Sequence, residues 1–118
     1  MYPMSSIATV TQSHPSNEFL IAQPGQPIVN ITAFTARQKV SGYVGGQISH
    51  LMGGDEPSLL LSNGRLVWRV PIILTSPTRG KLGIAGSLDV DARTGQLFIE
   101  PQLIIQLEQN AQALITAG

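Results

Sequence analysis

The feature that most constrains the fold is an alternating apolar run with a tight-turn signal in front of it. Every second position of this run is apolar, namely Leu66, Trp68, Val70, Ile72 and Leu74. An extended chain places all five side chains on one face. Asn63-Gly64 precedes the run, and both residues accept the positive φ that a two-residue type I′ hairpin requires. The sequence therefore predicts a long strand over about 65–75, paired through this turn with a shorter strand that contains Leu59 and Leu61.

Two further segments extend this hairpin into an antiparallel meander. A strand over about 81–91 follows a loop, and Ala92-Arg93-Thr94-Gly95 then turns the chain into a short strand over 96–99. Leu82, Ile84, Gly86, Leu88 and Val90 alternate within the 81–91 strand and are expected on one face. Pro71 has no N–H to donate, so the long strand must bulge there or turn that position away from a partner.

Helical periodicity flanks the meander on both sides. Apolar residues recur at three- and four-residue steps over about 33–52 and again over about 101–116. Thr35 can begin the first helix with Thr32 as the alternative start, and Pro101 suits the first turn of the second helix. We therefore expect the α+β class, with a curved four-stranded antiparallel meander and both helices packed on one face.

The chain divides into an arm and one domain. Residues 1–18 are rich in Ser, Thr and Pro and are predicted to form a flexible N-terminal arm, whereas residues 19–118 are predicted to be a single α+β domain. The second face of the long strand carries Val67, Pro71 and Ile73, which is too apolar a set to face water. We expect a second subunit or the segment 19–31 to cover it, and a homodimer is the first hypothesis.

Composition argues against several classes of protein. Seven Lys and Arg balance seven Asp and Glu, so no basic field favours nucleic acid. Charged residues make up only 12% of the chain, which favours self-association. The chain has no cysteine, which excludes disulfides and thiolate metal sites. Neither a membrane-length apolar run nor a signal-peptide pattern is present, so we expect no membrane contact and a cytoplasmic location.

Few side chains could carry chemistry. Arg65 and Arg69 share a strand face and could grip an acidic ligand or partner, or they could pair with nearby carboxylates as a solvated rim. Asp89 and Asp91 lie two residues apart and could converge on a cation, but a turn and surface role is the simpler interpretation. His50 lies at the end of the predicted first helix, and two isolated histidines make neither a metal site nor a nucleophile–base pair. We expect no metal and no cofactor.

Two functions fit these residues. The first is a non-enzymatic protein-interaction or regulatory module, because acid–base candidates are scarce. The second is a small-molecule-binding or weakly catalytic pocket between the first helix and the sheet, lined by Trp68, Tyr43 and His50. Together with Arg65 and Arg69, these are the candidate ligand- or partner-binding residues.

One phrase carries a family resemblance. The segment 90–97 reads VDARTGQL and resembles the VDA-x-TG-x-V ending of PepSY-type modules, and the helix leading into an antiparallel meander resembles them too. The resemblance covers roughly residues 33–99. It implies a half-wrapped, cystatin-like fold that acts without catalysis, as a peptidase-inhibitory or partner-binding unit. PepSY modules are usually extracytoplasmic, whereas this sequence shows no export signal, and the last helix and the N-terminal arm lie outside the match.

Overall fold

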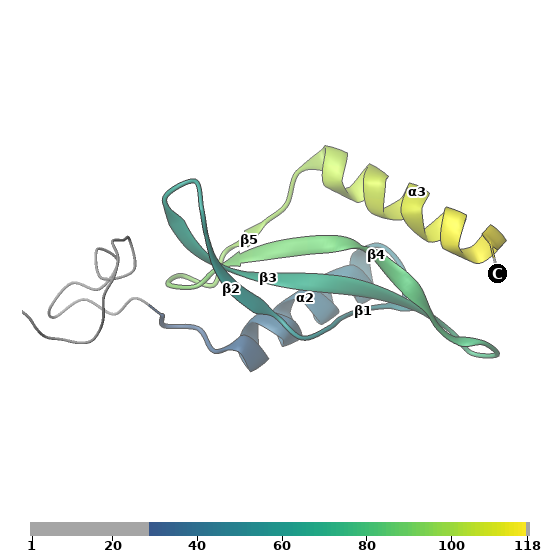
Figure 1. Ribbon diagram of the computed structural model, residues 1–118, viewed down its shortest axis with the longest axis horizontal. Helices are drawn as coiled ribbons and strands as arrows, with labels where there is room; N and C mark the ends of the chain where they lie inside the picture. Colours follow the sequence, from purple (N-terminus) through teal and green to yellow (C-terminus); the bar gives the residue numbers. More distant parts are fainter. Residues whose placement is uncertain (1–28, 118) are drawn as a thin grey trace, which may run out of the picture.

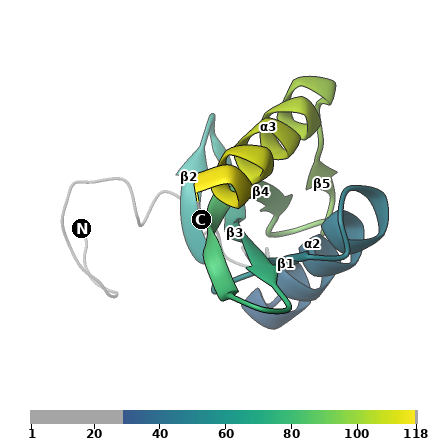
Figure 2. The same cartoon turned by 90° about the vertical axis from the view of Figure 1, so that its right-hand side faces the viewer.

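The computed structural model describes residues 29–117, which form a five-stranded antiparallel sheet with a helix on each side (Figures 1 and 2). In chain order the elements are α2 (Ala33–Gln47), β1 (Met52–Gly54), β2 (Ser58–Ser62), β3 (Arg65–Ser76), β4 (Gly80–Asp91), β5 (Leu97–Phe98) and α3 (Pro101–Ala117). The predicted α+β class and antiparallel meander are confirmed. The predicted arm over 1–18 and most of the segment 19–31 lie outside the described residues.

Strand β3 is the centre of the sheet. β4 pairs along one side of it, and both β1 and β2 pair along the other side. β5 adds a short strand to the far side of β4. The sheet has five strands rather than the four predicted, because Met52–Gly54 joins the edge of β3 instead of ending the first helix.

The turn between β2 and β3 forms as the sequence predicts. Asn63 has φ 52° and Gly64 has φ 74°, the left-handed pair that a type I′ hairpin requires. Ser62 pairs with Arg65 directly across this turn, which sets the register of the whole hairpin.

Pro71 lies in the middle of β3, where a proline is normally excluded. The N–H of Asp55 donates to the Pro71 carbonyl oxygen at 2.8 Å. In a strand the N and the carbonyl of one residue point to the same side, so the missing N–H of Pro71 also faces that side. There the chain has left β1 and has not yet entered β2, so no strand carbonyl is left without its donor. The break at residues 55–57 therefore accommodates the proline.

Strand β4 carries a bulge that breaks its alternation. Ile72 pairs with Gly86 but Ile73 pairs with Ile84, which leaves Ala85 as the extra residue. Ala85 is buried, whereas the side chain of Ile84 is 58% exposed. The prediction that Ile84 shares one face with Leu88 and Val90, which are buried, is therefore wrong, because the bulge shifts the pleat by one residue.

Helix α2 covers one face of the sheet. Thr32 is its N-cap, and its Oγ1 accepts from the Thr35 N–H at 3.0 Å. Ala36, Val40 and Val44 are fully buried in one cluster with the inward residues of β3. The helix ends at Gln47 rather than at 52, because the chain turns there to bring β1 alongside β3.

Helix α3 lies on the opposite side of the sheet, over β4 (Figure 2). Two glycines of β4 allow a close approach: a Cβ on Gly83 would lie 2.9 Å from Leu114 Cδ2, and one on Gly86 would lie 2.7 Å from Leu107 Cδ2. Asn110 Nδ2 also donates to the Ala85 carbonyl at 2.7 Å. The expectation that both helices share one face is thus wrong, since the glycines of β4 let α3 pack closely on the other side.

Candidate interaction site

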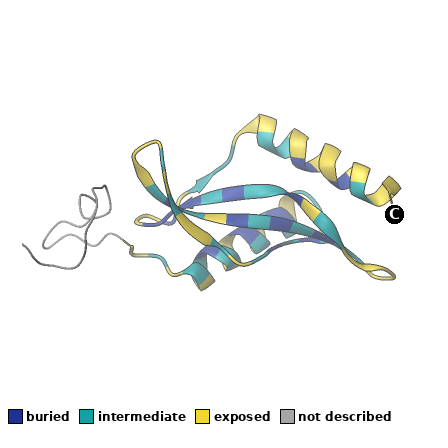
Figure 3. Ribbon diagram, viewed as in Figure 1, coloured by how far each residue is buried: buried dark blue, intermediate teal, exposed yellow. Residues whose placement is uncertain are grey.

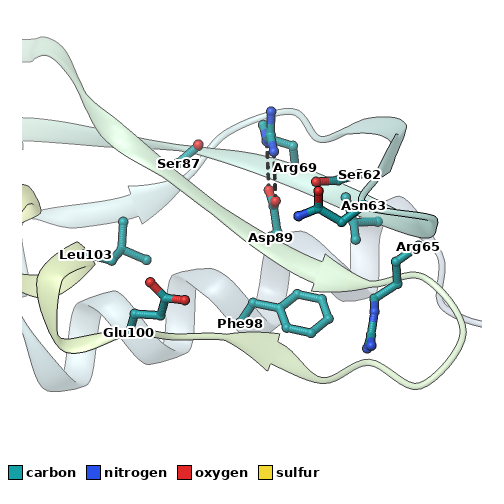
Figure 4. Close-up of a pocket in the computed structure, with 10 residues that line it drawn as sticks. Ser62, Asn63, Arg65, Arg69, Ser87, Asp89, Phe98, Glu100 and Leu103 are labelled. Carbon is teal, nitrogen blue, oxygen red and sulfur yellow. Dashed lines mark hydrogen bonds and ion pairs between the residues drawn. The ribbon is translucent and has the colours of Figure 1, made fainter.

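A polar cleft of about 530 Å³ lies between the β2–β3 hairpin and the connection from β5 into α3 (Figure 4). Arg65 and Arg69 of β3 line it together with Asp89 of β4, Phe98 of β5 and Glu100. The structure thus brings together the two arginines that the sequence placed on one strand face. Leu103 of α3 closes one end of the cleft.

Arg69 is held by a two-pronged ion pair. Its Nε lies 2.8 Å from Asp89 Oδ1, and its Nη2 lies 2.9 Å from Asp89 Oδ2. The two residues are direct cross-strand neighbours in the β3–β4 ladder. Hydrogen bonding to Asp89, followed by the charge of Asp89, raises the pKa of Arg69. Asp89 thus engages two of the five N–H donors of this guanidinium and balances its charge.

Asp91 holds the turn that follows β4. Its Oδ1 accepts from the N–H groups of Arg93 at 2.8 Å and Thr94 at 3.0 Å, and Arg65 Nη1 lies 3.5 Å from Oδ2. Burial alone would raise the pKa of Asp91, but the hydrogen bonds from Thr94 and Arg93 and the charge of Arg65 outweigh it and lower that pKa. The turn interpretation of this carboxylate is confirmed. Asp89 and Asp91 do not converge on a shared cation position, since each has its own arginine.

Arg65 is the more available of the two arginines. Its guanidinium lies 5.3 Å from the centroid of the Phe98 ring, a cation–π distance, and its contact with Asp91 is at the long end for an ion pair. Its side chain is 58% exposed. Arg65 therefore presents a cation at the open side of the cleft.

Trp68, Tyr43 and His50 do not come together. The indole Nε1 of Trp68 donates to the Ile31 carbonyl at 2.6 Å, just before α2 begins. His50 is exposed in the connection that follows the other end of α2. A helix of this length spans about 22 Å, so Trp68 and His50 lie at opposite ends of it. Tyr43 is half-buried against the core between them.

The open outer edge of strand β2 is the feature that sequence reasoning missed. Leu59 and Leu61 are 44% and 50% exposed, and no residue within 29–117 pairs with the outer side of this strand. Figure 3 shows the β2–β3 hairpin as an exposed projection beside the buried middle of the sheet. The sequence signal was the uncharged run Ser-Leu-Leu-Leu-Ser, but its position at an edge depends on topology.

The neighbouring edge strand β1, unlike β2, is protected by hydrogen bonds to α2. The Gly54 N–H donates to Ser41 Oγ at 2.9 Å, and Arg37 Nε donates to the Gly54 carbonyl at 3.0 Å. Both partners belong to α2, so this helix satisfies the outward N–H and carbonyl of Gly54. Helix α2 does nothing comparable for β2.

Other kinds of site find no support in residues 29–117. No three His, Asp or Glu side chains come together there as a metal site would require. Neither helix in this part of the chain is long and apolar enough to cross a membrane. No family model, curated protein or solved structure matches the chain. The function is therefore inferred from the surfaces described above.

Proposed function

We propose that this protein is a non-enzymatic interaction module that self-associates. The observation that carries the proposal is strand β2, an uncharged apolar edge whose outer side has no partner in residues 29–117. Soluble proteins usually block such an edge with charge, proline, a bulge or a covering element, because it is a template for pairing with another chain. An edge left open in this way is most simply explained by a binding partner.

The ionisable groups with shifted pKa values, Arg69 in the cleft and Asp91 beside it, support binding over catalysis. A general acid or base needs a pKa close to the working pH. Here the pKa of Asp91 is lowered and that of Arg69 is raised, so both groups hold their charge more firmly at neutral pH. Both are engaged in structural bonds. The arrangement suits a scaffold better than a reaction centre.

The apolar surface supports the same proposal. Leu59 is the cross-strand neighbour of Trp68, whose indole is bonded to Ile31, so the β2 edge continues into the segment that leads to α2. Val29 in that segment and Phe34 in the first turn of α2 are exposed. Low overall charge leaves little electrostatic repulsion between copies.

The likeness of segment 90–97 to PepSY-type modules agrees with a partner-binding role, and it remains a proposal. In this chain the phrase also has a local reason, because Asp91 and Gly95 build the β4–β5 turn. A second, different protein could contact Arg65 at the open side of the cleft. A pocket lined by Trp68, Tyr43 and His50 is not proposed, because Trp68 and His50 lie at opposite ends of α2.

Sedimentation velocity of the full chain tests self-association. We expect a dimer whose dissociation constant falls between about 1 μM and about 1 mM, the range of a small interface. The dimer should persist in high salt, because the proposed contact contains no ion pair. A single monomeric species across this range of protein concentrations would refute the proposal.

A further inference from the structure

We propose that two copies of this chain join through their β2 strands in antiparallel register, with Leu60 of one copy facing Leu60 of the other across a twofold axis. This inference rests on the proposed self-association and names its surface and register. Three observations carry it: the direction of the backbone groups of β2, the sequence of β2, and the residues that bound it.

The register of the hairpin determines which backbone groups point outward. Ser62 and Arg65 flank a two-residue turn and so exchange hydrogen bonds, and bonding then alternates along the ladder. Leu60 consequently turns its N–H and C=O toward β3, while Leu59 and Leu61 turn theirs to the outer edge. An independent bond agrees: the Leu66 carbonyl, opposite Leu61, accepts from the Ala92 N–H on the β4 side at 3.0 Å.

The sequence of β2 is self-complementary. Ser58 to Ser62 reads the same in both directions, so a twofold axis at Leu60 sets each Leu59 opposite Leu61 of the other copy. The four outward-facing residues then exchange four backbone hydrogen bonds. The two Leu60 residues form the close, non-hydrogen-bonded pair on the axis, with Cα atoms about 4.5 Å apart.

The residues at the two ends of β2 exclude the neighbouring registers. Centring the axis on Leu59 would set Leu61 opposite Pro57, which has no N–H to donate. Centring it on Leu61 would set Leu59 opposite Asn63, which the hairpin turn holds at φ 52°. A one-residue slip would direct inward-facing groups at outward-facing ones. Only the axis at Leu60 uses every outward group of β2.

The side chains reinforce this register. Leu59 and Leu61 lie on the same side of the sheet as Trp68, the side that carries α2. In the pair, the two leucines of one copy would meet the two of the other as direct cross-strand neighbours. No charged residue lies between Ser58 and Ser62 to oppose the contact.

Single cysteines in the full chain test the register cleanly, because the native sequence contains no cysteine. Under mild oxidation we expect Leu60→Cys to form an intermolecular disulfide, since its Cα separation lies within the disulfide range. Leu61→Cys alone should form this link at least ~10-fold more slowly, because its two copies lie about 8 Å apart. An equimolar mixture of Leu59→Cys and Leu61→Cys should cross-link efficiently as a heterodimer. Non-reducing electrophoresis and mass spectrometry measure each product.

A charge variant tests the same surface without cross-linking. Leu61→Lys should weaken dimerisation at least ~10-fold in sedimentation experiments, because it places a charge opposite Leu59 of the other copy. Ile115→Lys is the matched control: Ile115 is similarly exposed, at 41%, but lies on α3, and its substitution should leave the dimer unchanged. Far-ultraviolet circular dichroism confirms that both variants fold.

The outcomes separate this inference from the proposed function. A dimer in which Leu59→Cys alone or Leu61→Cys alone forms the disulfide faster than Leu60→Cys would overturn the register. A dimer that links at none of the three positions and tolerates Leu61→Lys would overturn β2 as the surface while self-association stands. A monomer with no cross-link would overturn both the register and self-association. Occupation of this edge by residues 1–28 of the same chain would give that result.

Discussion

Replacing Asp91 should show how much stability one carboxylate gives the turn between β4 and β5. Asp91→Ala removes the acceptor for the N–H groups of Arg93 and Thr94. A hydrogen bond to a charged group contributes about 1.5–3 kcal/mol. Arg93 and Thr94 are exposed, so water can replace part of what is lost. We therefore expect the free energy of unfolding to fall by about 2 kcal/mol rather than by the full sum for two bonds.

Asp91→Asn separates the charge from the hydrogen bonds. The amide keeps an oxygen that can accept from both N–H groups, but it loses the charge and the attraction to Arg65. We expect a loss of about 1 kcal/mol at neutral pH. Asp89→Ala serves as the comparison, because it breaks a more exposed ion pair with Arg69 and should cost about 0–1 kcal/mol.

The pH dependence follows from the direction of the pKa shift. The pKa of Asp91 is lower in the folded protein than the unfolded value near 3.9. Its stabilising effect is fully present above the unfolded pKa and is lost as the pH falls through the folded pKa. The stability gap between the native protein and Asp91→Asn should therefore be constant near neutral pH and narrow below about pH 4.

Urea unfolding followed by the fluorescence of Trp68, the single tryptophan, measures all of these values. The protein concentration must be the same throughout, because self-association would add to the apparent stability. The reasoning fails if the free energy of unfolding of Asp91→Ala lies within about 0.5 kcal/mol of that of the native protein. It also fails if the gap to Asp91→Asn does not change between neutral and acidic pH.

Three further substitutions test local packing, each by thermal unfolding in circular dichroism. Gly54→Ala should destabilise the protein by about 1–3 kcal/mol, because the new Cβ would lie 2.9 Å from Val70 Cγ1 and 3.1 Å from the Arg37 carbonyl oxygen. An unchanged melting temperature would mean that β1 and α2 are less closely packed. Gly42→Ala should stabilise by up to about 1 kcal/mol, since nothing lies within 4 Å of its Cβ position inside α2, and a lower melting temperature would contradict this. Thr32→Ala should cost about 1 kcal/mol by removing the N-cap of α2, and an unchanged melting temperature would show that the cap contributes nothing.

Local signals were the predictable part of this fold. Asn63-Gly64 specifies its turn through backbone preference alone, and the predicted hairpin is confirmed. Pro101 begins α3 as expected. The pairing of Arg65 and Arg69 with nearby carboxylates was also predictable, because alternation determines which strand residues share a face.

Long-range packing was not predictable from the same patterns. Periodicity identifies the apolar stripe of α3 but not the side of the sheet that it covers, and that side depends on the glycines of β4. The bulge at Ala85 leaves no composition signal, so Ile84 was assigned to the wrong face. Likewise, Trp68 and His50 were grouped by chemical type, but the length of α2 separates them. The open side of β2 emerged only once β1 and β2 were seen along the same side of β3.

The break at residues 55–57 also determines how large an assembly of this kind can grow. Because Pro71 interrupts the edge, the open stretch is confined to β2, while α2 satisfies the outward N–H and carbonyl of Gly54 in β1. On the other side of the sheet, β5 pairs only with Asp89 and Val90, and α3 packs on β4. Pairing about a twofold axis uses the same edge of both copies, so a dimer leaves neither β2 edge free for a third copy. A continuous edge from Met52 to Ser62 would instead allow staggered pairing and open-ended fibres. The proline thus favours a closed, finite assembly over a polymer.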